Sequence, residues 1–238
     1  LPISFASVQF SVRLRYRHLK NRSAFARVVY CIQMRAIRRF LILAGTLASA
    51  AATLLSPARA QETVDVALVL GVDVSRSMSF EELRIQRKGY ASAIASREVV
   101  RAIQQGAYGR IAVTLFEWAG NYHAREIIAW TVIENQADAD GIAARLLEDH
   151  SFAASRTSIS GAIDHAADLL AEMPYAADRR VIDISGDGPN NQGIPVTQAR
   201  DKAVAQGITI NGLPLMTTGG RGSYFNIPDL DRYYSRCV

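Results

Sequence analysis

The segment VDVALVLGVDVSRSMS, residues 64–79, joins a nearly unbroken apolar run to a short polar loop. The apolar part, residues 64–72, is typical of a β-strand that is buried on both faces, as strands are in parallel sheets. The polar part, residues 73–79, carries a carboxylate and several hydroxyls immediately after that strand. The segment therefore predicts a central strand whose carboxyl end presents oxygen atoms.

The rest of the chain alternates between strand-like and helix-like segments. Further apolar strands are expected at residues 110–118, 126–133, 179–185 and 208–213. Helices are expected at residues 80–105, 138–149, 158–173, 196–206 and 229–234. This alternation predicts an α/β fold of three layers, in which a doubly wound, mainly parallel sheet has helices on both faces.

Ligands of such sheets bind beyond the carboxyl ends of the strands, so the loops at these ends are candidate sites. Asp73, Ser75 and Ser77 alternate along the first loop and would point to one side of an extended backbone. Thr157 precedes a predicted helix, and Asp187 follows a predicted strand between two glycines. Such oxygen ligands, without His or Cys, favour a hard cation such as Mg²⁺. Taken singly, the same residues also suit helix capping and turn formation.

Two longer strings narrow the interpretation. They are RTSISGAID (Arg156–Asp164) and VIDISGDGPNNQG (Val181–Gly193). Together with the pattern D-x-S-x-S-M after an apolar strand, they resemble the metal-ion-dependent adhesion site of von Willebrand factor type A (VWA) domains. From about Thr63 onward the chain is similar to an exported bacterial subgroup of this superfamily, which implies a VWA-like, Rossmann-like fold.

The resemblance implies a role for each oxygen-bearing residue. Ser75, Ser77 and Thr157 would bind the metal through their hydroxyls, whereas Asp73 and Asp187 would hold it mainly through bridging waters. Mg²⁺ is the expected ion, with Mn²⁺ and Ca²⁺ as alternatives, and one coordination position would stay open. In the family, a carboxylate of a partner protein often fills that position. Neutral hydroxyl ligands also leave a cation electron-poor, which favours an anionic oxygen as the last ligand.

Some residues near the predicted site are candidates for contact with a partner protein. Arg76 stands where the family has a small residue, and its charge would either repel the metal or attract an acidic partner. Glu117 and Trp118 end a predicted strand at the same edge of the sheet, with packing on its own helix as the alternative for Trp118. Asn190 either shapes its loop or contacts the partner. Gly186 is a further departure, because many relatives carry Thr or Ser there.

The first sixty residues predict targeting rather than folded structure. An Arg-rich head, an apolar run at residues 40–55 and an Ala-x-Ala site ending at Ala60 are typical of a secretory signal peptide, residues 34–60. The run is shorter than the ~20 residues of a spanning helix, although an uncleaved anchor remains the alternative. We therefore expect one VWA-like domain at residues 61–238, periplasmic or secreted, with no stable membrane span after cleavage.

Charge also separates the two parts of the chain. The overall net charge is +5, but residues 1–60 contain ten Lys and Arg and no Asp or Glu. Residues 61–238 hold the other 17 basic and all 22 acidic side chains, so a nucleic acid is not an expected partner. Residues 1–33 are expected to be a non-native upstream extension, with an organellar transit peptide as the alternative. The resemblance implies further residues after residue 238, including a closing helix, so a truncated C-terminus is expected.

These observations favour a metal-dependent protein-binding module over an enzyme. A metal-assisted phosphohydrolase of the haloacid-dehalogenase type, on a similar α/β fold, needs a second Asp two residues after the first, and Ser75 occupies that position. The G-x-S-x-G elbow of a Ser–His–Asp hydrolase does not occur in the sequence. The phosphohydrolase and a structural VWA domain without metal binding remain the alternatives.

Overall fold

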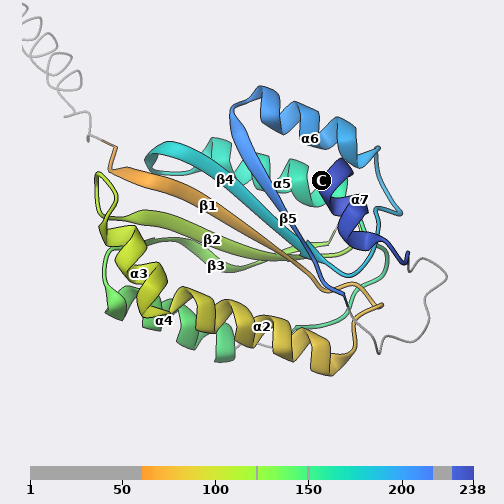
Figure 1. The fold of residues 1–238 in the computed structure, drawn as a ribbon, viewed down its shortest axis with the longest axis horizontal. Helices are drawn as coiled ribbons and strands as arrows, with labels where there is room; N and C mark the ends of the chain where they lie inside the picture. Colours follow the sequence, from red (N-terminus) through yellow and green to blue (C-terminus); the bar gives the residue numbers. More distant parts are fainter. Residues whose placement is uncertain (1–60, 122, 149–150, 217–226) are drawn as a thin grey trace, which may run out of the picture. The chain divides into compact units, whose positions relative to one another are not determined.

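Five strands build the sheet of the computed structural model, which describes residues 61–121, 123–148, 151–216 and 227–238. They are β1 (Thr63–Asp73), β2 (Ile111–Trp118), β3 (Ala124–Ile133), β4 (Ala176–Gly186) and β5 (Ile208–Pro214). The strands lie in the order β3-β2-β1-β4-β5, with β1 in the middle (Figure 1). All neighbours pair in parallel except β3, which runs antiparallel to β2 at one edge.

Helices cover both faces of this sheet, as Figure 1 shows. One face packs against α2 (Phe80–Ile94), α3 (Arg97–Gln104) and α4 (Gln136–Glu148). The other face packs against α5 (Ile159–Glu172), α6 (Val196–Ala205) and α7 (Leu230–Cys237). The structure therefore confirms the three-layer α/β fold with a mainly parallel sheet.

Side chains of β1 alternate between the two helix layers. Ala67 and Val69 belong to the apolar cluster under α5, α6 and α7, whereas Leu70 and Val72 belong to the cluster under α2, α3 and α4. Because neighbouring residues of a strand point to opposite faces, an apolar run of this kind can fill both clusters. This double burial fixes β1 in the middle of the sheet and thereby fixes the loop that follows it.

Besides shifts of a few residues at the ends of elements, two features differ from the sequence-based expectation. The single helix expected at residues 80–105 is two helices, because Ser96 interrupts it: the Ser96 hydroxyl accepts a hydrogen bond from the Val99 N–H at 3.2 Å and caps α3. The strand expected at residues 126–133 begins at Ala124 and returns antiparallel from β2.

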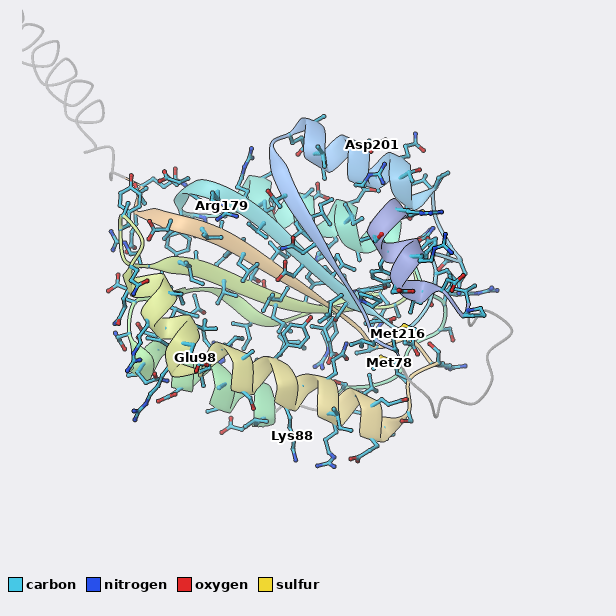
Figure 2. The ribbon with its side chains drawn as sticks, in the orientation of Figure 1. Met78, Lys88, Glu98, Arg179, Asp201 and Met216 are labelled. Atoms are coloured by element: carbon cyan, nitrogen blue, oxygen red, sulfur yellow. The ribbon has the colours of Figure 1, made fainter. Side chains whose placement is uncertain are left out.

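The carboxyl ends of β1 and β4 lie side by side. Val72 is opposite Ser185 in the parallel ladder, so Asp73 and Gly186, the next residues, end adjacent strands. Met78, labelled in Figure 2, lies at this end of the sheet and packs in a small apolar cluster with Val74. This pairing brings together two of the loops that the sequence marks as candidate sites.

The extension and the signal peptide predicted for residues 1–60 lie outside the described residues. Among the residues that are described, no helix is both long enough and apolar enough to cross a bilayer. Cys237 is half-buried and is a free thiol.

Gly71 lets β1 pack closely between its neighbours. A Cβ atom added at Gly71 would lie 2.6 Å from Ile184 Cδ1 and 3.1 Å from Phe116 Cζ. We therefore expect Gly71→Ala to lower the free energy of unfolding by about 1–3 kcal/mol, as overpacked cores do. Gly89→Ala, in α2, is the matched control: it meets no atom within 4 Å and should stabilise by up to about 1 kcal/mol. Urea unfolding of both variants measures this, and a Gly71→Ala protein as stable as the parent would contradict it.

Candidate metal centre

The loop after β1 is held at both of its ends. At its start, the buried Asp73 carboxylate accepts a hydrogen bond from the Ser75 N–H through Oδ1, at 2.7 Å. At its end, Ser79 caps α2 in a reciprocal capping box with Glu82. Asp73 thus forms the turn that the alternative interpretation expects, but Ser79 rather than Ser75 or Ser77 caps the helix. The hydroxyls of Ser75 and Ser77 point elsewhere.

Both hydroxyls meet Asp187 from the loop after β4. The Ser77 hydroxyl donates to Asp187 Oδ1 at 2.7 Å, and the Ser75 hydroxyl lies 3.5 Å from the same oxygen. The two serine Oγ atoms are 2.9 Å apart. We call these three atoms the oxygen triangle. Two loops that are about 110 residues apart in sequence therefore converge on one point.

Thr157 lies in the same region but is held through its backbone. Its N–H donates to Asn191 Oδ1 at 2.9 Å, and its carbonyl accepts from the Asn191 N–H at 2.9 Å. Thr157 is buried, and it is preceded by Arg156 in a left-handed conformation with φ of 73°. Its hydroxyl forms no hydrogen bond to Asp73 or the oxygen triangle among the described residues. The structure thus brings Asp73, the two serines and Asp187 into contact and places Thr157 beside the Asp187 loop.

The two carboxylates carry an electrostatic penalty in this arrangement. Burial, reinforced by the charge of Asp187, raises the pKa of Asp73 to about 7. Burial also raises the pKa of Asp187, with the nearby charge of Glu82 adding to the effect and the Ser77 hydroxyl opposing it. Within the described part of the chain, no Lys or Arg forms an ion pair with either group. A divalent cation between the two loops would remove this penalty, because it favours the ionised form of both.

The oxygen triangle suits a small hard cation. In an octahedron with ligands about 2.1 Å from the ion, neighbouring ligand atoms lie about 3 Å apart. The three oxygen–oxygen distances of the triangle are 2.7, 2.9 and 3.5 Å. Across the described residues, no group of three or more His, Cys, Asp or Glu side chains could hold a metal. The oxygen triangle offers two hydroxyls and one carboxylate oxygen, which suit a hard cation such as Mg²⁺ better than a softer metal.

Glu117 and Trp118 are not on the surface that a partner would contact, which corrects the first interpretation of both. Glu117 is 2% exposed and accepts hydrogen bonds from Arg87, Arg125 and Ser151. Trp118 is 1% exposed and belongs to the apolar cluster on the opposite face. Alternation along β2 sends the carboxylate towards the α2 layer and the indole towards the α5–α7 layer. Packing, the alternative for Trp118, is what the structure shows.

The other two partner candidates differ in exposure. Arg76 is exposed, between the two inward-pointing serines. Asn190 is half-buried, accepts from the Ser160 N–H at 3.1 Å and donates to the Ile194 carbonyl at 3.0 Å. Asn190 therefore shapes its loop, as one of its two interpretations expects, whereas Arg76 is free to approach another molecule.

Tyr234, in α7, is a residue that the sequence analysis did not include in the site. A Cβ atom added at Gly186 would lie 2.5 Å from the Tyr234 hydroxyl oxygen and 2.9 Å from Asp73 Oδ2. This crowding explains why glycine rather than Thr or Ser precedes Asp187. Leu230 and Tyr234 are four residues apart and lie on one buried helix face, and this spacing predicts the helix α7. The spacing alone does not predict that the Tyr234 hydroxyl lies near the loops of the site.

The fold and this site together define the class of protein. A sheet in the order β3-β2-β1-β4-β5, with one antiparallel edge strand and an oxygen-rich loop beyond β1, is the arrangement of a VWA-like domain, so the resemblance seen in the sequence is confirmed. More narrowly, residues 63–238 match the family DUF1194, described as a protein of unknown function, and the chain belongs to this family. A search of curated proteins found no match.

Several solved structures resemble this chain at low sequence identity. The conserved hypothetical protein BatB from Bacteroides thetaiotaomicron is 20% identical, with 68% of this chain and 78% of that chain covered and a TM-score of 0.43. An aerotolerance-related membrane protein from Bacteroides fragilis is 16% identical, with 72% and 96% covered and a TM-score of 0.44. Proximal thread matrix protein 1 from the mussel byssus, with a zinc-occupied MIDAS motif, is 15% identical, with 64% and 38% covered and a TM-score of 0.47. At these values the similarity is limited to the general arrangement of the chain.

Proposed function

We propose that this chain is an exported, metal-dependent protein-binding module. Asp73, Ser75, Ser77, Thr157 and Asp187 would hold one divalent cation, Mg²⁺ before Mn²⁺ or Ca²⁺. The observation that carries the proposal is the oxygen triangle, in which the loops after β1 and β4 meet through two hydroxyls and a carboxylate. Export rests on the predicted signal peptide at residues 34–60, and the module on residues 61–238.

The exposure of the ligands indicates the side from which a partner would approach. Asp73 is fully buried and Ser75 almost so, whereas Ser77 is half-buried and Arg76 is exposed. Solvent therefore reaches the centre past Ser77. A bound cation would supply positive charge there, and an acidic side chain of the partner would meet both the cation and Arg76. Charged ligands from Asp73 and Asp187 would hold the ion, and neutral hydroxyls would leave it attractive to that third carboxylate.

Titration with Mn²⁺ tests both the site and its open position. The Mn²⁺ signal in electron paramagnetic resonance reports binding, and water-proton relaxation reports water on the bound ion. We expect one Mn²⁺ per chain, and we expect sodium acetate, a carboxylate probe, to lower the relaxation enhancement as it replaces a water molecule. Asp187→Asn should weaken Mn²⁺ binding at least tenfold, whereas Asp183→Asn should not. Asp183 is the matched control because it lies on β4 and bonds Asn211 instead.

Two results would contradict the proposal. Mn²⁺ that binds equally well to Asp187→Asn would place the ion elsewhere. Turnover of p-nitrophenyl phosphate that requires Mg²⁺ and is lost in Asp73→Asn would favour the phosphohydrolase alternative, since Asp73 would then be the nucleophile.

A further inference from the structure

Three buried polar atoms behind the oxygen triangle lack a hydrogen-bond partner among the described residues. They are Asp73 Oδ2, Trp118 Nε1 and the Tyr234 hydroxyl. All three side chains surround Gly186: the position of its missing Cβ lies 2.5 Å from the Tyr234 hydroxyl, 2.9 Å from Asp73 Oδ2 and 3.3 Å from Trp118 Cζ2. Such atoms are rare in folded proteins, and a cluster of three on one glycine calls for a physical explanation.

The hydrogen-bonding capacities of these groups are complementary. An ionised carboxylate only accepts, an indole N–H only donates, and a phenol does either. A tyrosine phenol carries its proton at neutral pH, so the Tyr234 hydroxyl is available as a donor. The Asp73 oxygen that lies near the same Gly186 position, Oδ2, is the one that Ser75 does not hold, because the Ser75 N–H binds Oδ1.

We propose that Tyr234 is a positioning residue of the candidate metal centre: its hydroxyl donates a hydrogen bond that reaches Asp73 Oδ2 through one buried water. This inference rests on the proposed function for the role of Asp73. The Ser75 N–H and the Tyr234 hydroxyl would then hold the two oxygens of one carboxylate and fix its rotation. Groups that orient a metal ligand in this way change metal affinity by about 10–100-fold when they are removed.

The same hydrogen bond would connect α7 to the site. The adjacent residue of the helix also contacts a site loop, since the Tyr233 hydroxyl accepts from the Asn190 N–H at 3.2 Å. Two successive tyrosines of α7 therefore reach the ends of β1 and β4. Because coupling between two equilibria is reciprocal, an ion that orders Asp73 would also stabilise the packing of α7 against the sheet.

Tyr234→Phe tests the proposal because it removes one oxygen and keeps the ring. We expect Mn²⁺ affinity, measured by electron paramagnetic resonance, to fall at least tenfold, with an unchanged far-ultraviolet circular dichroism spectrum. Tyr233→Phe, on the same helix, removes a hydroxyl that accepts from the Asn190 N–H and has no bond to Asp73, so it should change the Mn²⁺ affinity less than threefold. Equal losses in both variants would overturn the specific role of Tyr234.

Tryptophan fluorescence reports the surroundings of Trp118 in the folded protein, so it distinguishes a specific role of the Tyr234 hydroxyl from a general loss of stability. The chain contains two tryptophans, and Trp130→Phe leaves Trp118, the ladder partner of Asp73, as the only one. In this background Mg²⁺ should shift the Trp118 emission, and the added Tyr234→Phe substitution should change the size of that shift at saturating Mg²⁺. An identical shift with and without the Tyr234 hydroxyl would contradict the proposal.

A metal-free measurement separates this proposal from the proposed function. The changes in Tm caused by Tyr234→Phe and by Asp73→Asn, each alone and together, form a double-mutant cycle. Non-additive shifts, together with a lower Tm in Tyr234→Phe, support the hydrogen bond. This holds even if the parent binds no Mn²⁺, a result that would contradict only the proposed function. Additive shifts, or a Tyr234→Phe protein with a higher Tm than the parent, would overturn the hydrogen bond itself.

Discussion

Replacing Ser75 and Ser77 together with alanine will abolish the thermal stabilisation that Mg²⁺ gives the parent protein. A ligand that binds only the folded state adds about 2.7 kcal/mol at 100 times its dissociation constant. The double variant keeps only the Asp187 oxygen of the oxygen triangle, so it loses two of the three hydroxyl ligands of the proposed site. Differential scanning calorimetry with Mg²⁺, with Mn²⁺ and with EDTA measures the response.

Ser79→Ala is the matched control for this experiment. It removes a hydroxyl from the same loop, but one that caps α2 and does not contact Asp187. We expect it to cost about 1 kcal/mol under every condition and to keep the full response to Mg²⁺. A response that survives in the double variant would mean that the ion binds elsewhere. A parent without any response would favour the structural domain that binds no metal.

Arg87→Ala will lower the free energy of unfolding by about 3–5 kcal/mol, the effect expected when one partner of a buried ion pair is removed. Glu117 is 2% exposed, and the Arg87 guanidinium, itself largely buried, donates to its Oε1. Without Arg87, a carboxylate would be left in the α2 layer with less charge compensation than its burial requires. Urea unfolding at pH 7 measures the loss.

Two further substitutions test whether burial is the cause. Arg84→Ala breaks the exposed pair with Glu81 in the same helix and should cost no more than about 0.5 kcal/mol. The double variant Arg87→Met/Glu117→Met removes both buried charges and should be more stable than Arg87→Ala alone. A double variant that is less stable than Arg87→Ala would contradict the explanation, because the loss would then come from packing.

The fold was predictable because one strand is buried on both faces. In a chain of alternating helices and strands, the apolar run at residues 64–72 indicates a strand that is buried on both faces, and the structure has β1 there. An apolar pattern does not show whether a strand runs parallel or antiparallel to its neighbour, so the direction of β3 could not be predicted from it. The turn residues Gly120 and Asn121 between β2 and β3 nevertheless indicated a hairpin. The helix break at Ser96 carried neither Gly nor Pro and was hidden in a continuous helical pattern.

The candidate site was predictable only as far as topology determines it. Parallel neighbours end at the same edge, so Asp73 and Asp187 had to be close once β1 and β4 were adjacent. The sequence does not reveal which face a strand-end residue occupies. For this reason Glu117 was a candidate for partner contact, and both partner contact and packing were open for Trp118. Tyr234 lies more than 150 residues from Asp73, and its approach depends on how α7 packs, which local patterns do not encode.

Hydrogen bonds hold both ends of the loop between Asp73 and Ser79 in the absence of a ligand. The carboxylate of Asp73 accepts a hydrogen bond at the first end, and the capping box of α2 forms at the other. Binding an ion would therefore require little loss of backbone freedom, and such preorganisation raises affinity without additional contacts. A preorganised loop would also select among cations by their size and charge. Ions that need longer coordination distances, such as Ca²⁺, should therefore bind more weakly.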